Sequence, residues 1–110
     1  MSALQTIKDV INNGTGHTFG ELNGRYIVSL PGEQVFRDVQ SDDAERVAIE
    51  VLDRFILAKP GQAPGIWMYE GDLYLDTSES YDAYSVAVWV AREREQLAVY
   101  DQVKGITINV

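Results

Sequence analysis

The second half of this sequence contains a run of acidic residues that could do chemistry. Five carboxylic acids lie within thirteen positions that hold no lysine or arginine: Glu70, Asp72, Asp76, Glu79 and Asp82. Carboxylate oxygens are ligands that calcium and magnesium prefer, but the run lacks the alternating acids, glycine and distant glutamate of an EF-hand loop. A solvated turn followed by acids near the start of a helix, where the helix dipole favours negative charge, explains the run more simply. We therefore predict an acidic patch and no metal site.

The acids and the single histidine also show no pattern typical of acid–base catalysis. Two candidate pairs of acids are Asp42 with Asp43 and Asp72 with Asp76, but glycosidase chemistry needs two carboxyls that face one cleft. The single histidine, His17, lies in the stretch GTGHTFG, which matches neither a dinucleotide fingerprint nor a P-loop. A nucleophile motif of the form G-x-S-x-G is absent from the sequence. We predict that the protein is not an enzyme and uses no cofactor. A small hydrolase would require several of these groups, with Asp38, to converge in one pocket.

A group of aromatic residues is the best candidate for a binding surface. It comprises Trp67, Tyr69, Tyr74 and Trp89. Such side chains anchor protein interfaces because they bury a large area and keep a polar atom for hydrogen bonding. The alternative interpretation is that a helix covers this face and places Trp89 on Trp67 within the core. Both interpretations stay open, and the second is slightly favoured.

Composition limits the possible functions. A chain of 110 residues forms one domain, 1–110. Seventeen acids against nine bases give a net charge of −8, and the bases are scattered singly, which disfavours direct binding to nucleic acid. The chain has no cysteine and no apolar run of membrane-spanning length, and its first residues are not expected to form a signal peptide. We expect a cytoplasmic protein with no membrane partner.

Apolar spacing predicts helices and hairpins. A short helix is expected over residues 3–12, and a longer one from about residue 42 to residue 58, because apolar residues recur every three or four positions. Asn23-Gly24 predicts a hairpin over residues 18–30, since a two-residue type I′ turn needs positive φ. A strand at 34–39 would complete a meander. Further hairpins are expected over residues 66–76, turning at either Glu70-Gly71 or Gly71-Asp72, and over residues 97–110, turning at Lys104-Gly105.

Residues 81–96 are expected to form a central helix packed on the sheet, with neighbouring elements or a partner chain covering the rest of it. Ala83 to Ala91 are apolar or small on every side of a helical wheel, which is typical of a helix covered on most of its surface. SVAVWV could also form a strand, but Ser78 or Ser80 as a helix cap favours a helix. The expected fold is α+β: one two-layer domain, with an antiparallel or mixed sheet of hairpins and about three helices.

The region from Gly71 to Val110 resembles a recurring C-terminal region of small uncharacterised proteins of actinobacteria and their phages. The matching residues are Tyr74-Leu75-Asp76, Ala91 to Arg94, Gln96 to Ala98, Tyr100-Asp101 and Gly105. Gly16 to Phe19 and Arg25 to Ser29 are similar to a glycine-rich stretch in the N-terminal part of those proteins. The resemblance implies a phage or mobile-element setting and supplies no activity and no catalytic residue.

Together these features predict a non-enzymatic accessory protein that binds another protein, or itself, through the aromatic hairpin and the helix at 81–96. A phage-encoded protein of this kind would act in the host cytoplasm, and a place in the virion stays open. The alternative is an acidic inhibitor that mimics the charge of DNA and occupies a nucleic-acid-binding host or defence enzyme. Such binding would depend strongly on salt concentration.

Overall fold

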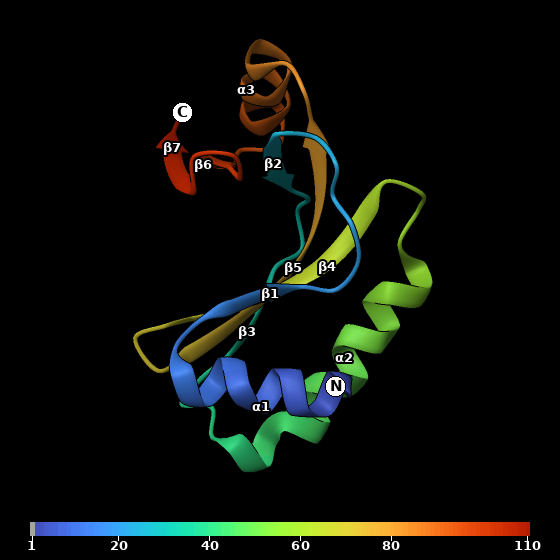
Figure 1. The fold of residues 1–110 in the computed structure, drawn as a ribbon, viewed down its shortest axis with the longest axis vertical. Helices are drawn as coiled ribbons and strands as arrows, with labels where there is room; N and C mark the ends of the chain where they lie inside the picture. The colour runs from blue at the N-terminus through green and yellow to red at the C-terminus, as the bar shows by residue number, and fades with distance from the viewer. Residues whose placement is uncertain (1) are drawn as a thin grey trace.

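Residues 2–110 are described by a computed structural model, and they form a single α+β domain (Figure 1). The helices are α1 (Ala3–Asn13), α2 (Ala44–Leu57) and α3 (Tyr84–Glu93), with a short 3₁₀ turn, η1 (Ser41–Asp43), before α2. The strands are β1 (Gly16–Thr18), β2 (Tyr26–Ser29), β3 (Gln34–Phe36), β4 (Gln62–Tyr69), β5 (Asp72–Tyr81), β6 (Ala98–Asp101) and β7 (Ile106–Asn109). The predicted fold class is confirmed.

The strands form one antiparallel sheet organised around β5. The strand order is β1-β4-β5-β2-β6-β7, and β3 also pairs with β5. Along one edge β5 pairs with β4, and along the other it pairs first with β3 and then with β2. Figure 1 shows β5 running from the end that carries α1 and α2 to the end that carries α3. The long strand β5 thus links the two ends of the molecule.

The hairpin of β4 and β5 confirms the predicted turn and extends further than predicted. Glu70 and Gly71 have φ values of 50° and 82°, as a two-residue type I′ turn requires. Residues 62–65, before the predicted hairpin, belong to β4, and residues 77–80, where the sequence predicts a helix cap, belong to β5. Ser78 and Ser80 are therefore strand residues and not helix caps. The polar segment stays extended because β2 supplies its backbone with hydrogen-bond partners.

The predicted hairpin at Asn23-Gly24 is wrong. β1 pairs with β4 and β2 pairs with β5 and β6, so the two segments never pair with each other. Neither turn residue has a positive φ. Gly24 is instead packed against β5, where an added Cβ would lie only 2.6 Å from the Tyr81 backbone nitrogen. The predicted meander fails for the same reason, since β3 pairs with β5 and not with β2.

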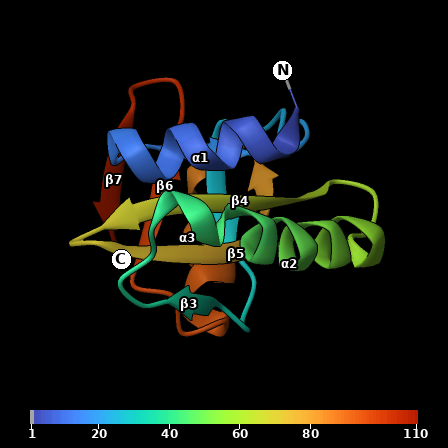
Figure 2. The same cartoon turned by 90° about the horizontal axis from the view of Figure 1, so that it is seen from below.

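All three helices pack against one face of the sheet, at its two ends. The cluster under α1 and α2 includes Ile7, Val47 and Leu73, and the smaller cluster under α3 includes Val28 and Val99. Figure 2 shows α1 and α2 near one another along the long hairpin. Val28 pairs with Glu79, so the two side chains lie on the same face of the sheet. Glu79 is an even number of positions from Leu75 on β5, so Leu75 shares that face too and both clusters lie on it. This face is therefore the covered one.

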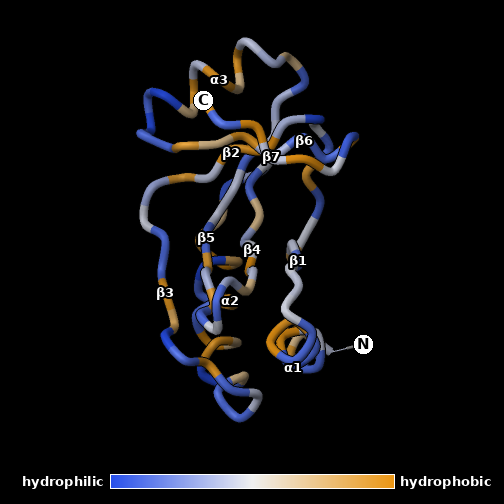
Figure 3. Tube along the Cα trace, turned by 90° about the vertical axis from the view of Figure 1, so that its left-hand side faces the viewer, coloured by the Kyte–Doolittle hydropathy of each residue, from blue (hydrophilic) through white to orange (hydrophobic). Residues whose placement is uncertain are grey.

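α3 confirms the predicted helix but not its central position. It lies at the far end of the molecule from α1 and α2 (Figures 1 and 3). Only Ala87 and Ala91 of this helix are buried, because these small side chains let the helix approach β2 and β6. Trp89 is 64% exposed, so the neighbouring elements of this chain leave much of the helix uncovered. None of the helices in residues 2–110 has the length and apolar character needed to cross a membrane.

Candidate functional site

The sheet face opposite the helices contains an open hollow of about 1140 Å³. Residues of β1, β4, β5, β2, β6 and β7 line it, together with the loop that joins α3 to β6. Trp67 and Tyr100 form aromatic parts of the lining, and Leu97 at its rim is 82% exposed. The helices cannot cover this hollow because their contacts are with the other face of the sheet.

The floor of the hollow is polar and buried. Asp76 and Ser78 lie two residues apart on β5 and so project from the same face, with 5% and 7% of their surfaces exposed. The Ser29 hydroxyl of β2 donates a 2.6 Å hydrogen bond to Asp76 Oδ2 and lies 3.4 Å from the Ser78 hydroxyl. Gly65, opposite Asp76 on β4, has no side chain to close the hollow above the carboxylate.

Burial controls the electrostatics of this floor. It raises the pKa of Asp76 above its usual value, although the hydrogen bond from Ser29 and the charge of Arg54 oppose the increase. The pKa of Glu33, which also lines the hollow, is raised by burial and by the negative charge of Asp76. Arg54 itself reaches β5 from α2 on the covered face, where it donates to Gln34, Thr77 and the Gly32 carbonyl.

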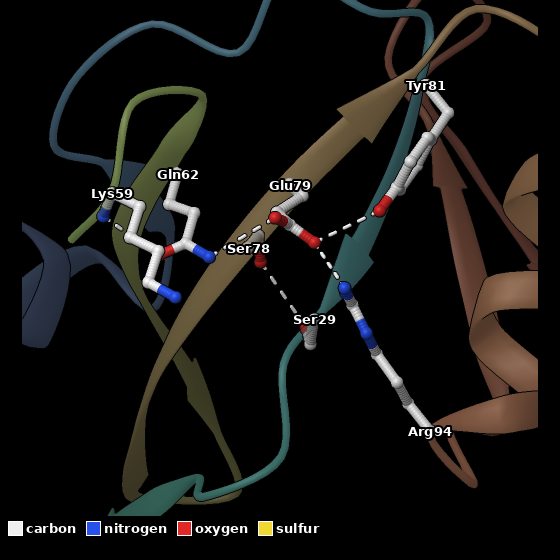
Figure 4. A network of polar contacts seen from close by, with 7 residues as sticks. All are labelled: Ser29, Lys59, Gln62, Ser78, Glu79, Tyr81 and Arg94. Atoms are coloured by element: carbon white, nitrogen blue, oxygen red, sulfur yellow. Dashed lines mark hydrogen bonds and ion pairs between the residues drawn. The ribbon is translucent and has the colours of Figure 1, made fainter.

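Glu79 has a separate role on the covered face (Figure 4). Its carboxylate accepts hydrogen bonds from Arg94, from the Tyr81 hydroxyl at 3.0 Å and from Gln62 at 3.2 Å. Burial raises the pKa of Glu79, but these three hydrogen bonds outweigh it and leave the pKa below its usual value. The network lies between the two apolar clusters and joins the end of α3 to β4 and β5.

The five acids of the sequence run do not form one patch. Glu70 and Asp72 lie at the turn of the long hairpin, where Asp72 accepts hydrogen bonds from Arg37 at 2.8 Å and from the Asp38 backbone at 2.9 Å. Asp82 is exposed beyond the opposite end of β5. Asp76 and Glu79 project from opposite faces. Within residues 2–110 the structure contains no cluster of three histidine or acidic residues that could hold a metal ion.

The residues considered for catalysis are also dispersed. His17 pairs with Ile66, which places its side chain on the helix side of the sheet, where its ring lies edge-on to Phe19 at 4.7 Å. Asp42 lies in η1 at the start of α2. His17 also contributes to the lining of the hollow at β1, whereas Asp38, Asp42 and Asp72 do not line it.

The fold places three of the four predicted aromatic binding residues on one face of the sheet. Trp67 and Tyr74 stack at 5.1 Å with their ring planes 13° apart, on the face predicted for them. Tyr69, on the same face, is 59% exposed near the turn. The placement of Trp89 on Trp67 is wrong, because Trp89 belongs to the helix at the far end of the covered face. Three of the four aromatic residues therefore share the uncovered face.

Other residues of the hollow were missed by sequence reasoning. They are Ser29, Glu33, Gly65, Ser78, Leu97 and Tyr100. The alternation Asp76, Ser78, Ser80 is a signal that could have revealed a strand with a polar face. The position of Ser29 beside Asp76 had no such signal, since it depends on strand pairing across 47 positions of the chain.

A second uncovered apolar surface lies on α2. Its outward residues are Ile49, Leu52, Phe55, Ile56 and Leu57, each exposed by more than half. This surface offers apolar contact alone, whereas the hollow offers aromatic contact, negative charge and hydrogen-bond acceptors within one concave site. The hollow is therefore the better candidate for specific recognition.

Comparison of the chain with protein-family models, with curated proteins and with solved structures finds no match.

Proposed function

We propose that this protein is a non-enzymatic binding protein that recognises another protein through the uncovered face of its sheet. The observation that supports the proposal is the hollow itself, an open concavity with Trp67 and Tyr100 in its lining and exposed Leu97 at its rim. Aromatic side chains in a concave site are typical anchors of protein interfaces. The proposal keeps the aromatic hairpin as the binding element and replaces Trp89 by Tyr100.

The proposed setting is a phage or another mobile element, where the protein would act as an accessory factor in the host cytoplasm. This part of the proposal rests on the resemblance of the region from Gly71 to Val110. The alternative, an inhibitor that mimics DNA, is less well supported, because the acids of the sequence run lie at both ends and on both faces of β5. An inhibitor of that kind needs its charges arranged along one surface.

Affinity capture from the native host with two matched variants tests the proposal. Trp67→Ser removes an aromatic side chain from the hollow, and Trp89→Ser removes the same side chain from α3, away from the hollow. We expect one partner protein to be retained by the wild type and by Trp89→Ser and to be lost with Trp67→Ser. Far-UV circular dichroism and the melting temperature check that both variants fold.

Measurement of the solution mass of the purified protein separates the two kinds of partner. A dimer that dissociates in Trp67→Ser and persists in Trp89→Ser would identify the partner as a second copy of the chain. The proposal fails if both variants retain the same proteins as the wild type, or if only Trp89→Ser loses them.

A further inference from the structure

The charged residues that line the hollow are all acidic. Its lining includes the carboxylic acids Glu33, Asp76 and Glu95 and, among residues 2–110, contains no lysine or arginine. The whole chain carries a net charge of −8, which adds to the negative potential there. A site of this kind attracts positive groups and repels anions, because charge inside a concave, partly desolvated site is less screened than on an open surface.

Asp76 provides an acceptor that is not fully used. The residue is 5% exposed, and one carboxylate oxygen, Oδ2, receives the hydrogen bond from Ser29. The Ser78 hydroxyl also interacts with this carboxylate and opposes the increase in pKa that burial causes, while the direct hydrogen bond from Ser29 leaves the other oxygen, Oδ1, free to accept. Oδ1 lies beside Gly65, and a Cβ atom added to this glycine would be 3.4 Å from the oxygen. Among residues 2–110 the one buried side-chain nitrogen or oxygen without a partner is Arg94 Nη1, so Asp76 Oδ1 is accessible and can accept a hydrogen bond from a donor in the hollow.

Aromatic surface lies in the same hollow as this carboxylate. Trp67 and Tyr100 line it from β4 and β6, on either side of the strands that carry Asp76 and Ser29. A cation above the face of an indole or phenol ring is attracted by the ring quadrupole. The apolar Leu97 at the rim suits the aliphatic stem of a long basic side chain, which packs on apolar surface while its charged end reaches a polar group.

We propose that the hollow receives a lysine or arginine side chain of a protein partner, whose charged end donates hydrogen bonds to Asp76. This inference rests on the proposed function and specifies the chemistry of the partner. A protein is favoured over a free amine because the hollow, at about 1140 Å³, exceeds the volume of roughly 300–1,000 Å³ typical of small-molecule sites. The remaining space and the exposed rim accommodate residues that neighbour the basic side chain.

NMR titration of the full chain with short peptides tests the inference. The probes are a capped pentapeptide with a central lysine, the same peptide with arginine, the same peptide with norleucine, and free n-butylamine. Trp89→Phe leaves the Trp67 indole as the single indole reporter and alters no residue of the hollow. We expect saturable shifts at Trp67, Ser29 and Ser78 with the basic peptides, and binding at least tenfold weaker for norleucine and for n-butylamine.

Two variants with the same change of charge identify the residue responsible. Asp76→Asn keeps an oxygen that can accept from Ser29 but removes the negative charge, and we expect it to weaken basic-peptide binding at least tenfold. Asp82→Asn removes an exposed charge outside the hollow and should leave binding within twofold. Equal losses in the two variants, or equal binding of the norleucine and lysine peptides, would overturn the inference. Tighter binding of n-butylamine than of either peptide would also overturn it, because the site would then suit a free amine.

The two proposals fail separately. Protein capture that depends on Trp67, together with no binding of basic peptides, would overturn the cation inference and leave the protein-binding function standing. Basic-peptide binding that depends on Asp76 would support the chemistry of the hollow. Capture unaffected by Trp67→Ser would then overturn the assignment of this face as the protein-binding surface.

Discussion

Asp76 and Glu79 lie three residues apart on β5 and project from opposite faces of the sheet. Asp76 is bonded to Ser29 in the uncovered hollow, and Glu79 is bonded to Arg94 beneath α3. The alternation of side chains along a strand is the cause, because an odd separation reverses the face. Two acids that are close in sequence thus have different surroundings: burial raises the pKa of one, while hydrogen bonds lower that of the other.

Asp76→Asn should stabilise the protein at neutral pH. Because burial raises the pKa of Asp76, the folded state holds this proton more tightly than the unfolded chain. The resulting stabilisation is complete below the unfolded pKa, near about 3.9, and is lost as pH rises through the folded pKa. We expect the variant to have a higher melting temperature than the wild type at pH 7 and a similar one at pH 3. Asp82→Asn is the control, and an equal effect of Asp76→Asn at both pH values would contradict the assignment.

Glu79→Ala should destabilise the fold by about 1–3 kcal/mol, because it leaves Arg94 partly buried without its acceptor. The matched control is Glu93→Ala at the exposed end of α3, expected to change the free energy of unfolding by no more than about 0.5 kcal/mol. Urea titration at pH 7 measures both. Since the pKa of Glu79 is lowered, its contribution is present above the unfolded pKa and is lost as pH falls through the folded pKa. Equal effects of the two variants would show that the network contributes nothing to stability.

Glu70→Asn should stabilise the protein by roughly 0.5–1 kcal/mol. Glu70 has a φ of 50°, a left-handed conformation that costs energy in most residues and that asparagine tolerates better. Glu21→Asn, at an exposed loop position without positive φ, makes the same chemical change without this benefit. Thermal unfolding of both variants checks the prediction, and a gain from Glu21→Asn of the same size would refute the conformational explanation.

Trp89→Ala should cost less than about 1 kcal/mol of unfolding free energy, since the side chain is 64% exposed. Leu73→Ala provides the comparison. Leu73 has no exposed surface, and a leucine-to-alanine change in such a core costs about 2–5 kcal/mol. Guanidinium unfolding of both variants measures the difference. A cost for Trp89→Ala as large as that for Leu73→Ala would place the indole in the core after all.

Elements specified by neighbouring residues were predictable from the sequence. The helices α1 and α2 follow from apolar residues repeated every three or four positions, and the turn near Gly71 follows from a glycine between two alternating segments. The two faces of the hairpin at 66–76 follow from alternation along the strand. Each of these features depends on interactions within a few residues, so the local pattern contains the necessary information.

The sequence by itself determined the α+β class, the helices, the long hairpin and the face on which Trp67 and Tyr74 stack. Only the tertiary structure decided that Asn23-Gly24 is no hairpin turn, that α3 is peripheral and that Ser29 joins Asp76. The physical reason is that both edges of β5 pair with strands that are distant in the sequence. Backbone hydrogen bonds hold these pairs together, and every residue type except proline can donate and accept them, so local side-chain patterns do not specify the partner. The burial of α3 likewise depends on which sheet surface remains free after those strands have paired.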